Sequence, residues 1–175
     1  MSNQTKTILF LVPPNISFAD FVDPPKNIST ITKNGGSQQF GSLITDIPLG
    51  IISLSAYIKK HFNVDSMAID FNVTLNQIEE FTYPDFESYF HDVLSQEAYI
   101  DFKPDIVGIS ALFTSAYTSI IDLATLVKTV FPKAINIVGG NLPTSMYKEI
   151  LSDSTEVDAV CFGEGENPLL DLLKV

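Results

Sequence analysis

Arginine is absent from this 175-residue sequence. Its 10 basic residues are all lysines, and the 21 acidic residues set against them give a net charge of -11. Arginine carries the planar guanidinium group that grips phosphate and guanine through two hydrogen bonds at once. A chain without it, and with this acidic balance, is not expected to bind nucleic acid. The acidic residues gather between positions 65 and 105, which favours a solvated outer face over an acidic docking surface.

Cysteine is nearly absent. Cys161 stands alone, which excludes an internal disulfide and any metal or iron–sulfur site built from several cysteines of this chain. A single cysteine also suits a cytoplasmic protein. Long apolar runs are missing too: residues 8–12 are too few for a signal-peptide core, and no later run approaches the roughly 20 residues that span a bilayer. We therefore expect a cytoplasmic protein with no membrane partner.

What the sequence does contain is a regular alternation of apolar strands and amphipathic helices. With 45% hydrophobic residues, residues 1–175 are expected to fold as one domain. Strands are predicted at residues 7–12, 64–70, 105–110, 134–140 and 157–163, and helices at 48–62, 86–102, 115–131, 144–151 and 167–174. This order predicts an α/β fold, a flavodoxin-like (Rossmann-like) five-stranded parallel sheet with helices on both faces.

Small residues follow three of the predicted strands. They stand at positions 110–112, 139–141 and 163–166. In an open parallel sheet the ligand site lies outside the carboxyl ends of the strands. Glycine there lets a ligand approach the backbone, and a small hydroxyl bonds a buried polar atom without blocking entry. These turns therefore predict a ligand site at the carboxyl edge of the sheet.

Several common site types do not match these turns. The turn after the first strand reads PPNISF and lacks both the glycine pattern of dinucleotide folds and the lysine-bearing phosphate loop. A phospho-receiver needs an aspartate where Ser110 stands. Nucleophilic catalysis by Ser110 needs a histidine, but His61 falls at a helix end and His91 in an acidic helix, so both are predicted at the surface. No catalytic residue and no metal ligand is predicted in this chain.

The turns do resemble one family. Ser110, Ala111 and Leu112, with the pair Gly139 and Gly140, resemble the Ser-x-Leu and Gly-Gly motifs of cobalamin-binding domains. The resemblance implies that the serine hydroxyl meets the dimethylbenzimidazole of the cofactor and that the glycines clear space for its nucleotide tail. The third motif of the family, Asp-x-His-x-x-Gly, has no counterpart after the first strand. This departure implies cobalamin bound base-off, with no histidine on cobalt.

An ordered set of segments narrows the resemblance to one branch. PLGIISLSAYIKK, the Asp70 that ends the second strand, PDIVGIS, IVGGNLPT and FGEGE are similar to the amino-terminal domain of cobalamin-dependent radical S-adenosylmethionine enzymes. That group includes the anaerobic magnesium-protoporphyrin ester cyclase and many methyltransferases. The resemblance implies a downstream barrel, outside these residues, that holds a four-iron four-sulfur cluster and S-adenosylmethionine and performs methyl transfer or cyclase-type oxidoreductase chemistry.

The cofactor-binding residues predicted from these turns span three loops. They are Ser110, Ala111, Leu112, Thr114, Gly139, Gly140, Asn141, Thr144, Gly163, Glu164 and Gly165. Structural alternatives exist: Ser110 as a helix cap, the glycine pair as a plain turn and Glu164 as a helix-start acid. Two other functions stay open, a cofactor-free scaffold domain of a radical enzyme and a stand-alone cobalamin carrier or sensor.

The segment 13–47 is too long for an ordinary connection. We expect it to form a long loop that is partly disordered when the domain is alone. We also expect this loop to cover one face of the corrin or to pack against a partner domain.

Overall fold

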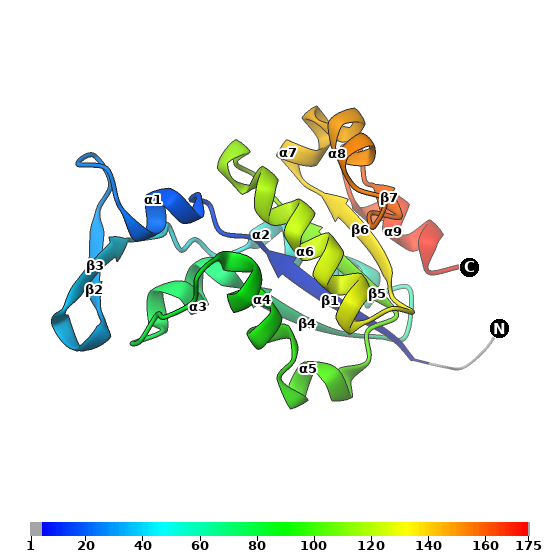
Figure 1. Cartoon of the computed structure of the whole chain (residues 1–175). Coiled ribbons are helices and arrows are strands. Elements are labelled where there is room, and N and C mark those ends of the chain that lie inside the picture. The colour runs from blue at the N-terminus through cyan, green and yellow to red at the C-terminus, as the bar shows by residue number, and fades with distance from the viewer. Residues whose placement is uncertain (1–4, 175) are drawn as a thin grey trace.

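A five-stranded parallel sheet forms the centre of the computed structural model, which describes residues 5–174 (Figure 1). The strand order is β4-β1-β5-β6-β7, and every neighbouring pair is parallel. The strands are β1 (Lys6–Val12), β4 (Val64–Asp70), β5 (Ile106–Ser110), β6 (Ile135–Gly139) and β7 (Ala159–Val160). The order places the second strand of the sheet outside the first, so the predicted flavodoxin-like topology is confirmed.

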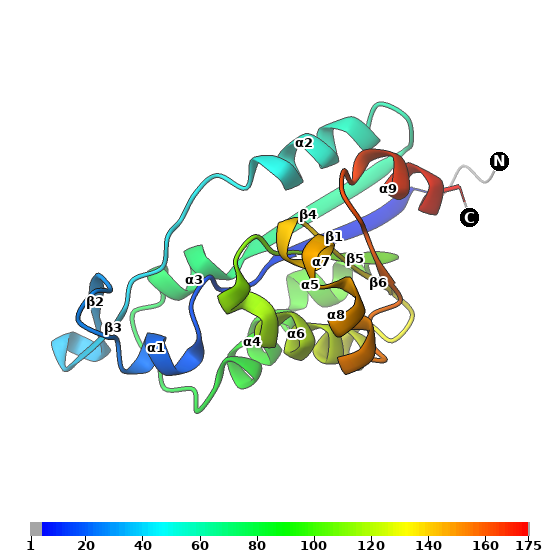
Figure 2. The ribbon, with the colours of Figure 1, turned by 90° about the horizontal axis from the view of Figure 1, so that it is seen from above.

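Helices cover both faces of this sheet, as predicted (Figure 2). On one face lie α2 (Leu49–Ile58) and α9 (Glu166–Leu172), which contact each other. On the other face α4 (Phe86–Leu94) packs against α6 (Tyr117–Val130). Within residues 5–174, each helix is too short or too polar to cross a membrane.

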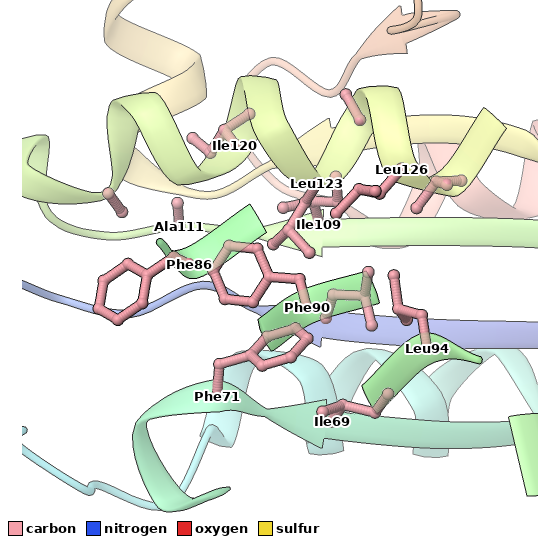
Figure 3. Close-up of a cluster of buried hydrophobic side chains, with 14 of the residues drawn as sticks. Ile69, Phe71, Phe86, Phe90, Leu94, Ile109, Ala111, Ile120, Leu123 and Leu126 are labelled. Carbon is pink, nitrogen blue, oxygen red and sulfur yellow. The ribbon is translucent and has the colours of Figure 1, made fainter. Parts of the chain in front are cut away.

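Alternation along the strands divides the core between these two faces. Ile8 and Phe10 of β1 point toward α2 and α9, whereas Leu9 and Leu11 point toward α4 and α6. All four side chains are at most 3% exposed, as expected for a parallel strand covered on both sides. The core under α4 and α6 is the larger one and is rich in phenylalanine (Figure 3).

Two predicted helices are interrupted. The helix expected over 86–102 splits into α4 and α5 (Glu97–Phe102), because Gln96 adopts an extended backbone between them. The helix expected over 144–151 is instead α7 (Asn141–Ser145) and α8 (Tyr147–Asp153), with Met146 in non-helical geometry. A further helix, α3 (Phe71–Gln77), was not predicted from the sequence. Asp70 caps its amino end by accepting a hydrogen bond from the Asn72 amide.

The segment 13–47 is not the long irregular loop that we expected. It contains α1 (Phe18–Val22) and an antiparallel hairpin of β2 (Thr30–Lys33) and β3 (Gln38–Gly41), joined by a 3-10 turn, η1 (Asn34–Gly36). The physical reason is a cluster of phenylalanine rings that fixes this unit to the start of α4 and to the residues that precede it. Its rings belong to Phe18, Phe21, Phe40, Phe81 and Phe86, with neighbouring centroids 5.0–6.4 Å apart.

Lys33 ties the same hairpin to α3. Its side chain is buried, and its ammonium donates hydrogen bonds to the Asn76 carbonyl at 3.1 Å and the Ile78 carbonyl at 2.6 Å. These carbonyls lie at the carboxyl end of α3, where a cation is favoured by the helix dipole. Residues 42–48 lack regular structure and run toward the start of α2.

Candidate functional site

A cavity of about 250 Å³ opens at the carboxyl edge of the sheet. Its floor is formed by the ends of β1, β4 and β5, and its outer wall by residues 44–51, which include the first turn of α2. This is the edge where the topology predicts a ligand. The cavity is much smaller than a whole corrin, so it is suited to one part of such a ligand.

Ser110 ends β5 and lines this cavity together with Ala111 and Leu112. No described residue forms a hydrogen bond with the Ser110 hydroxyl. The alternative role of Ser110 as a helix cap is contradicted, because Phe113 precedes η2 (Thr114–Ala116) and no side chain caps that turn. The hydroxyl is therefore available to a ligand.

The two glycines after β6 have different structural environments. Gly140 has a φ of 103°, and a Cβ there would lie 2.5 Å from the Ala111 carbonyl oxygen. Only glycine fits that close approach of two turns. Gly139 has no such constraint: a Cβ would meet one atom within 4 Å, the Cβ of Cys161 at 3.3 Å. Gly140 thus serves the fold, and Gly139 keeps the sheet face that carries Ser110 free of a side chain.

The remaining predicted residues lie around this edge but not in the cavity wall. Thr144, in α7, accepts a hydrogen bond from the Gly163 amide at 3.1 Å and so fixes the turn after β7. Gly165 faces Leu54 of α2, because a Cβ there would lie 3.3 Å from the Leu54 Cδ2. The side chains of Thr114, Asn141 and Glu164 are exposed. The structure therefore groups Ser110, Ala111 and Leu112 in the cavity and the others beside it.

The individual residues of one wall of the cavity were not predicted from the sequence. Ile44, Ile47 and Leu49 are 61%, 71% and 70% exposed, although all three are large and apolar. A signal was present, because α2 is apolar on all sides, which is unusual for a helix with one side in water. Exposed apolar side chains that gather at a cavity typically mark a binding surface, whereas single scattered ones do not.

Asn72 fixes the floor of the cavity. Its side chain is only 4% exposed. The Asn72 Oδ1 accepts a hydrogen bond from the Asn15 amide at 2.8 Å, and its Nδ2 donates to the Pro13 carbonyl at 3.1 Å and to the Asp70 Oδ1 at 2.9 Å. This network joins the turn after β1 to the end of β4. Because a buried amide with three partners is costly to disturb, the floor is rigid.

Nucleophilic chemistry has no support at this edge. His61 and His91 are both exposed, as predicted. Burial raises the pKa of the Cys161 thiol, and Glu166 and Glu164 raise it further, so the nucleophilic thiolate is disfavoured. Within residues 5–174, no three histidine, cysteine or acidic side chains are placed to hold a metal ion. What the edge offers is shape, a free hydroxyl and apolar surface, which suit ligand binding.

Comparison with known proteins identifies the family. The family model described as the B12 binding domain matches residues 46–173, which is most of the chain. The chain therefore belongs to the family of B12-binding domains, and its cofactor is cobalamin. The resemblance drawn from the turn motifs is confirmed.

Three curated relatives add detail. Two are anaerobic magnesium-protoporphyrin IX monomethyl ester cyclases, from Rubrivivax gelatinosus (37% identical over 71 residues) and Cereibacter sphaeroides (32% over 74). The third is the cytidylyl-2-hydroxyethylphosphonate methyltransferase of Streptomyces wedmorensis, 37% identical over 70 residues. The matches span 40–42% of this chain and only 12–13% of the relatives. The relatives are therefore much longer proteins.

Proposed function

We propose that this domain holds cobalamin at the carboxyl edge of its sheet, base-off and with no histidine on cobalt. The observation that carries the proposal is the pairing of Ser110, whose hydroxyl lacks a partner among the described residues, with Gly139, which has no side chain. They end neighbouring strands, because Ser110 of β5 pairs with Gly139 of β6. Together they offer a hydrogen bond and a stretch of sheet without a side chain to the same ligand group.

The nucleotide tail of cobalamin fits this pairing. Ser110, Gly139 and Gly108 lie on the sheet face that α2 and α9 cover, since Gly108 packs against Phe10 and Gly139 against Cys161. An aromatic base that enters there meets small residues on the sheet and apolar side chains on the helices. The Ser110 hydroxyl then supplies a hydrogen bond to a base nitrogen.

The corrin ring fits the apolar rim of the cavity. Leu112 and Phe113 on one side are 61% and 49% exposed, and Ile47 and Leu49 lie on the other. These side chains gain stability if a large ring covers them. Residues 44–47, the end of the segment that we expected to cover the corrin, therefore keep a covering role in this proposal.

The proposed absence of a histidine on cobalt is supported by the floor of the cavity. Pro13, Asn15, Asp70 and Asn72 lie in it, and none of them carries an imidazole. His61 lies beyond the carboxyl end of α2, and His91 lies in α4, on the other face of the sheet. When bound, cobalamin supplies a cobalt centre for alkyl or one-electron transfer, and this domain binds and orients it.

We further propose that the domain serves a larger enzyme. The relatives are a cyclase and a methyltransferase by name, and the aligned part is a small share of each. In such an enzyme, a separate barrel would hold the four-iron four-sulfur cluster and S-adenosylmethionine and would carry the catalytic residues. The substrate contacts would lie mostly outside the residues described here.

Retention of pigment tests the cofactor proposal. The purified chain is mixed with hydroxocobalamin and desalted, and its visible spectrum is recorded. We expect the parent chain to keep the pigment with a base-off spectrum. The variant Gly139→Val should lose it, because the added side chain occupies the space proposed for the tail.

A matched variant separates loss of the site from loss of the fold. Ala159→Val enlarges an exposed side chain on the neighbouring strand β7 and should bind like the parent. Both variants are checked by thermal unfolding. A parent chain that keeps no pigment would overturn the proposal and favour a cofactor-free scaffold domain, and a base-on spectrum would overturn the base-off arrangement alone.

A further inference from the structure

The cavity at the carboxyl edge has an unusual charge composition. Its wall contains two carboxylates, Asp46 and Asp70, and no lysine, and the whole chain lacks arginine. The other polar side chains in the wall are Asn15, Asn72 and Ser110. Hydrogen-bond acceptors therefore dominate, and no cation balances the two negative charges within the wall.

Asp70 is the better fixed of the two carboxylates. Its Oδ1 accepts hydrogen bonds from the Asn72 amide at 2.9 Å and from the Asn72 Nδ2 at 2.9 Å. No described residue donates to its Oδ2. Asp46, by contrast, is exposed in the irregular segment 42–48. Asp70 thus presents one positioned, unpaired carboxylate oxygen in the wall of the cavity.

Such an oxygen selects its ligand by charge. It accepts a strong, charge-assisted hydrogen bond from an N–H donor. It repels a carboxylate or phosphate, more strongly in a partly enclosed cavity than in open water. The edge of a ligand that enters here must therefore carry N–H donors, and any phosphate must lie elsewhere.

Resting on the proposed binding of cobalamin, we infer that Asp70 is a specificity residue that accepts a hydrogen bond from a propionamide arm of the corrin and excludes corrinoids with a free acid there. Primary amides ring the corrin of cobalamin, and each carries two N–H donors. Hydrolysis of one arm to a carboxylate removes the donors and adds a negative charge. Hydrolysis of the arm thus removes the hydrogen bond and also places a second carboxylate against that of Asp70.

Equilibrium titration with two kinds of corrinoid tests this inference. The ligands are cobalamin and its three isomeric monocarboxylic acids, in each of which one propionamide arm has been hydrolysed. Binding is followed by visible absorption at pH 7.5. We expect at least one isomer to bind the parent chain at least about tenfold more weakly than cobalamin does. The reason is that the isomer loses one charge-assisted hydrogen bond and gains a repulsion.

The variant Asp70→Asn assigns this discrimination to one side chain. Asparagine keeps an oxygen that can cap α3, so the fold should persist, and thermal unfolding checks this. We expect the variant to bind cobalamin more weakly than the parent and to reduce the discrimination to less than about threefold. Asp65→Asn makes the same change at an exposed position of the same strand β4 and should leave the discrimination unchanged.

The possible failures are distinct. If the parent chain binds all three acids as tightly as cobalamin, the inference is wrong whatever the variants do. If Asp70→Asn keeps the full discrimination between cobalamin and the acids, a group other than Asp70 distinguishes the amide arm from the acid. If the parent chain binds no corrinoid, the proposed function itself fails and the inference falls with it.

Discussion

The two faces of the sheet are built in different ways. Under α4 and α6 the core is large and filled by aromatic rings: the Phe71 and Phe90 centroids lie 4.5 Å apart, and both side chains are 0% exposed. Under α2 and α9 the core is small, and the strands present Gly108, Ser110 and Gly139 toward the carboxyl edge.

The difference shows how one sheet carries both stability and a site. A tightly packed face leaves no space for a ligand, because protein interiors are packed like crystals. A face with small residues loses packing energy, which binding of a ligand can replace. In this domain we assign most of the stability to the α4 and α6 face and the ligand to the edge of the α2 and α9 face.

The largest expected effect comes from making the same substitution, leucine to alanine, on each face and comparing the loss of stability. Leu94 in α4 is 0% exposed, whereas Leu49 at the start of α2 is 70% exposed. Leu94→Ala should lower the free energy of unfolding by about 2–5 kcal/mol, because it leaves a cavity in a packed core. Leu49→Ala should change it by less than about 0.5 kcal/mol. Urea unfolding measures both, and equal losses would refute the contrast between the faces.

The next largest effect distinguishes Gly140 from Gly139 by what each contributes to the stability of the fold. Gly140→Ala should destabilise the fold by about 1–3 kcal/mol through its backbone conformation alone, and more through the clash with the Ala111 carbonyl. Gly139→Ala should cause no comparable loss, since its Cβ would meet only Cys161 at 3.3 Å. Chemical denaturation compares the two. A severe loss of stability in Gly139→Ala would place both glycines in the fold and remove the distinction between them.

The fold was predictable because strong local patterns agreed with it. The strand predicted at 105–110 is apolar from Ile106 to Ile109, as a parallel strand covered on both faces should be, and the structure confirms it as β5 (Ile106–Ser110). The predictions failed where a tertiary contact decides the local structure. The local signal for the hairpin in residues 18–41 is limited to the turn Asn34-Gly35. Its strands show no clear alternation, and distant rings such as Phe81 and the buried contacts of Lys33 hold them in place.

The site was predictable only in its motif residues. Ser110 and Gly139 follow buried strands, so topology alone brings them to one edge. Ile44 and Ile47 come from an irregular segment whose path depends on side-chain contacts such as the Asn15 Nδ2, which donates to the Ile44 carbonyl at 2.9 Å. Sequence patterns do not encode such contacts, so this wall of the cavity required the structure.

A titratable group weakens the well-packed face. Asp122 in α6 faces Glu87 and Asp85 of the α4 region, and burial, with these like charges, raises the pKa of its carboxyl to about 6. The unfolded value lies near 3.9. The folded state therefore binds the proton more tightly, so stability from this group is full below about pH 4 and falls as the pH rises through 6.

Asp122→Asn should remove this loss. At pH 7 the variant should melt about 2–4 °C above the parent, the shift that about 1 kcal/mol produces in a domain of this size. This is less than the full pKa shift implies, because solvent screens a half-exposed carboxylate. At pH 4 the difference should vanish, because the parent carboxyl is then protonated in the folded state. Differential scanning calorimetry measures both, with Asp101→Asn on the exposed surface of α5 as the control for net charge. An equal shift at both pH values would refute the role of Asp122 ionisation.

The smallest effect compares two serines of the α2 and α9 face, one proposed to bind the ligand and one that stabilises the fold. Ser110→Ala should weaken cobalamin binding about fivefold, the worth of one hydrogen bond near 1 kcal/mol, and leave the melting temperature unchanged, because its hydroxyl has no partner among the described residues. Ser55→Ala should do the opposite, since the Ser55 hydroxyl bonds Ser66 at 2.8 Å between α2 and β4. Titration with cobalamin measures the affinity of both variants, and thermal unfolding measures their melting temperatures. If Ser110→Ala instead lowers stability with affinity intact, this serine belongs to the scaffold, and the division between a packed face and a binding face loses its central residue.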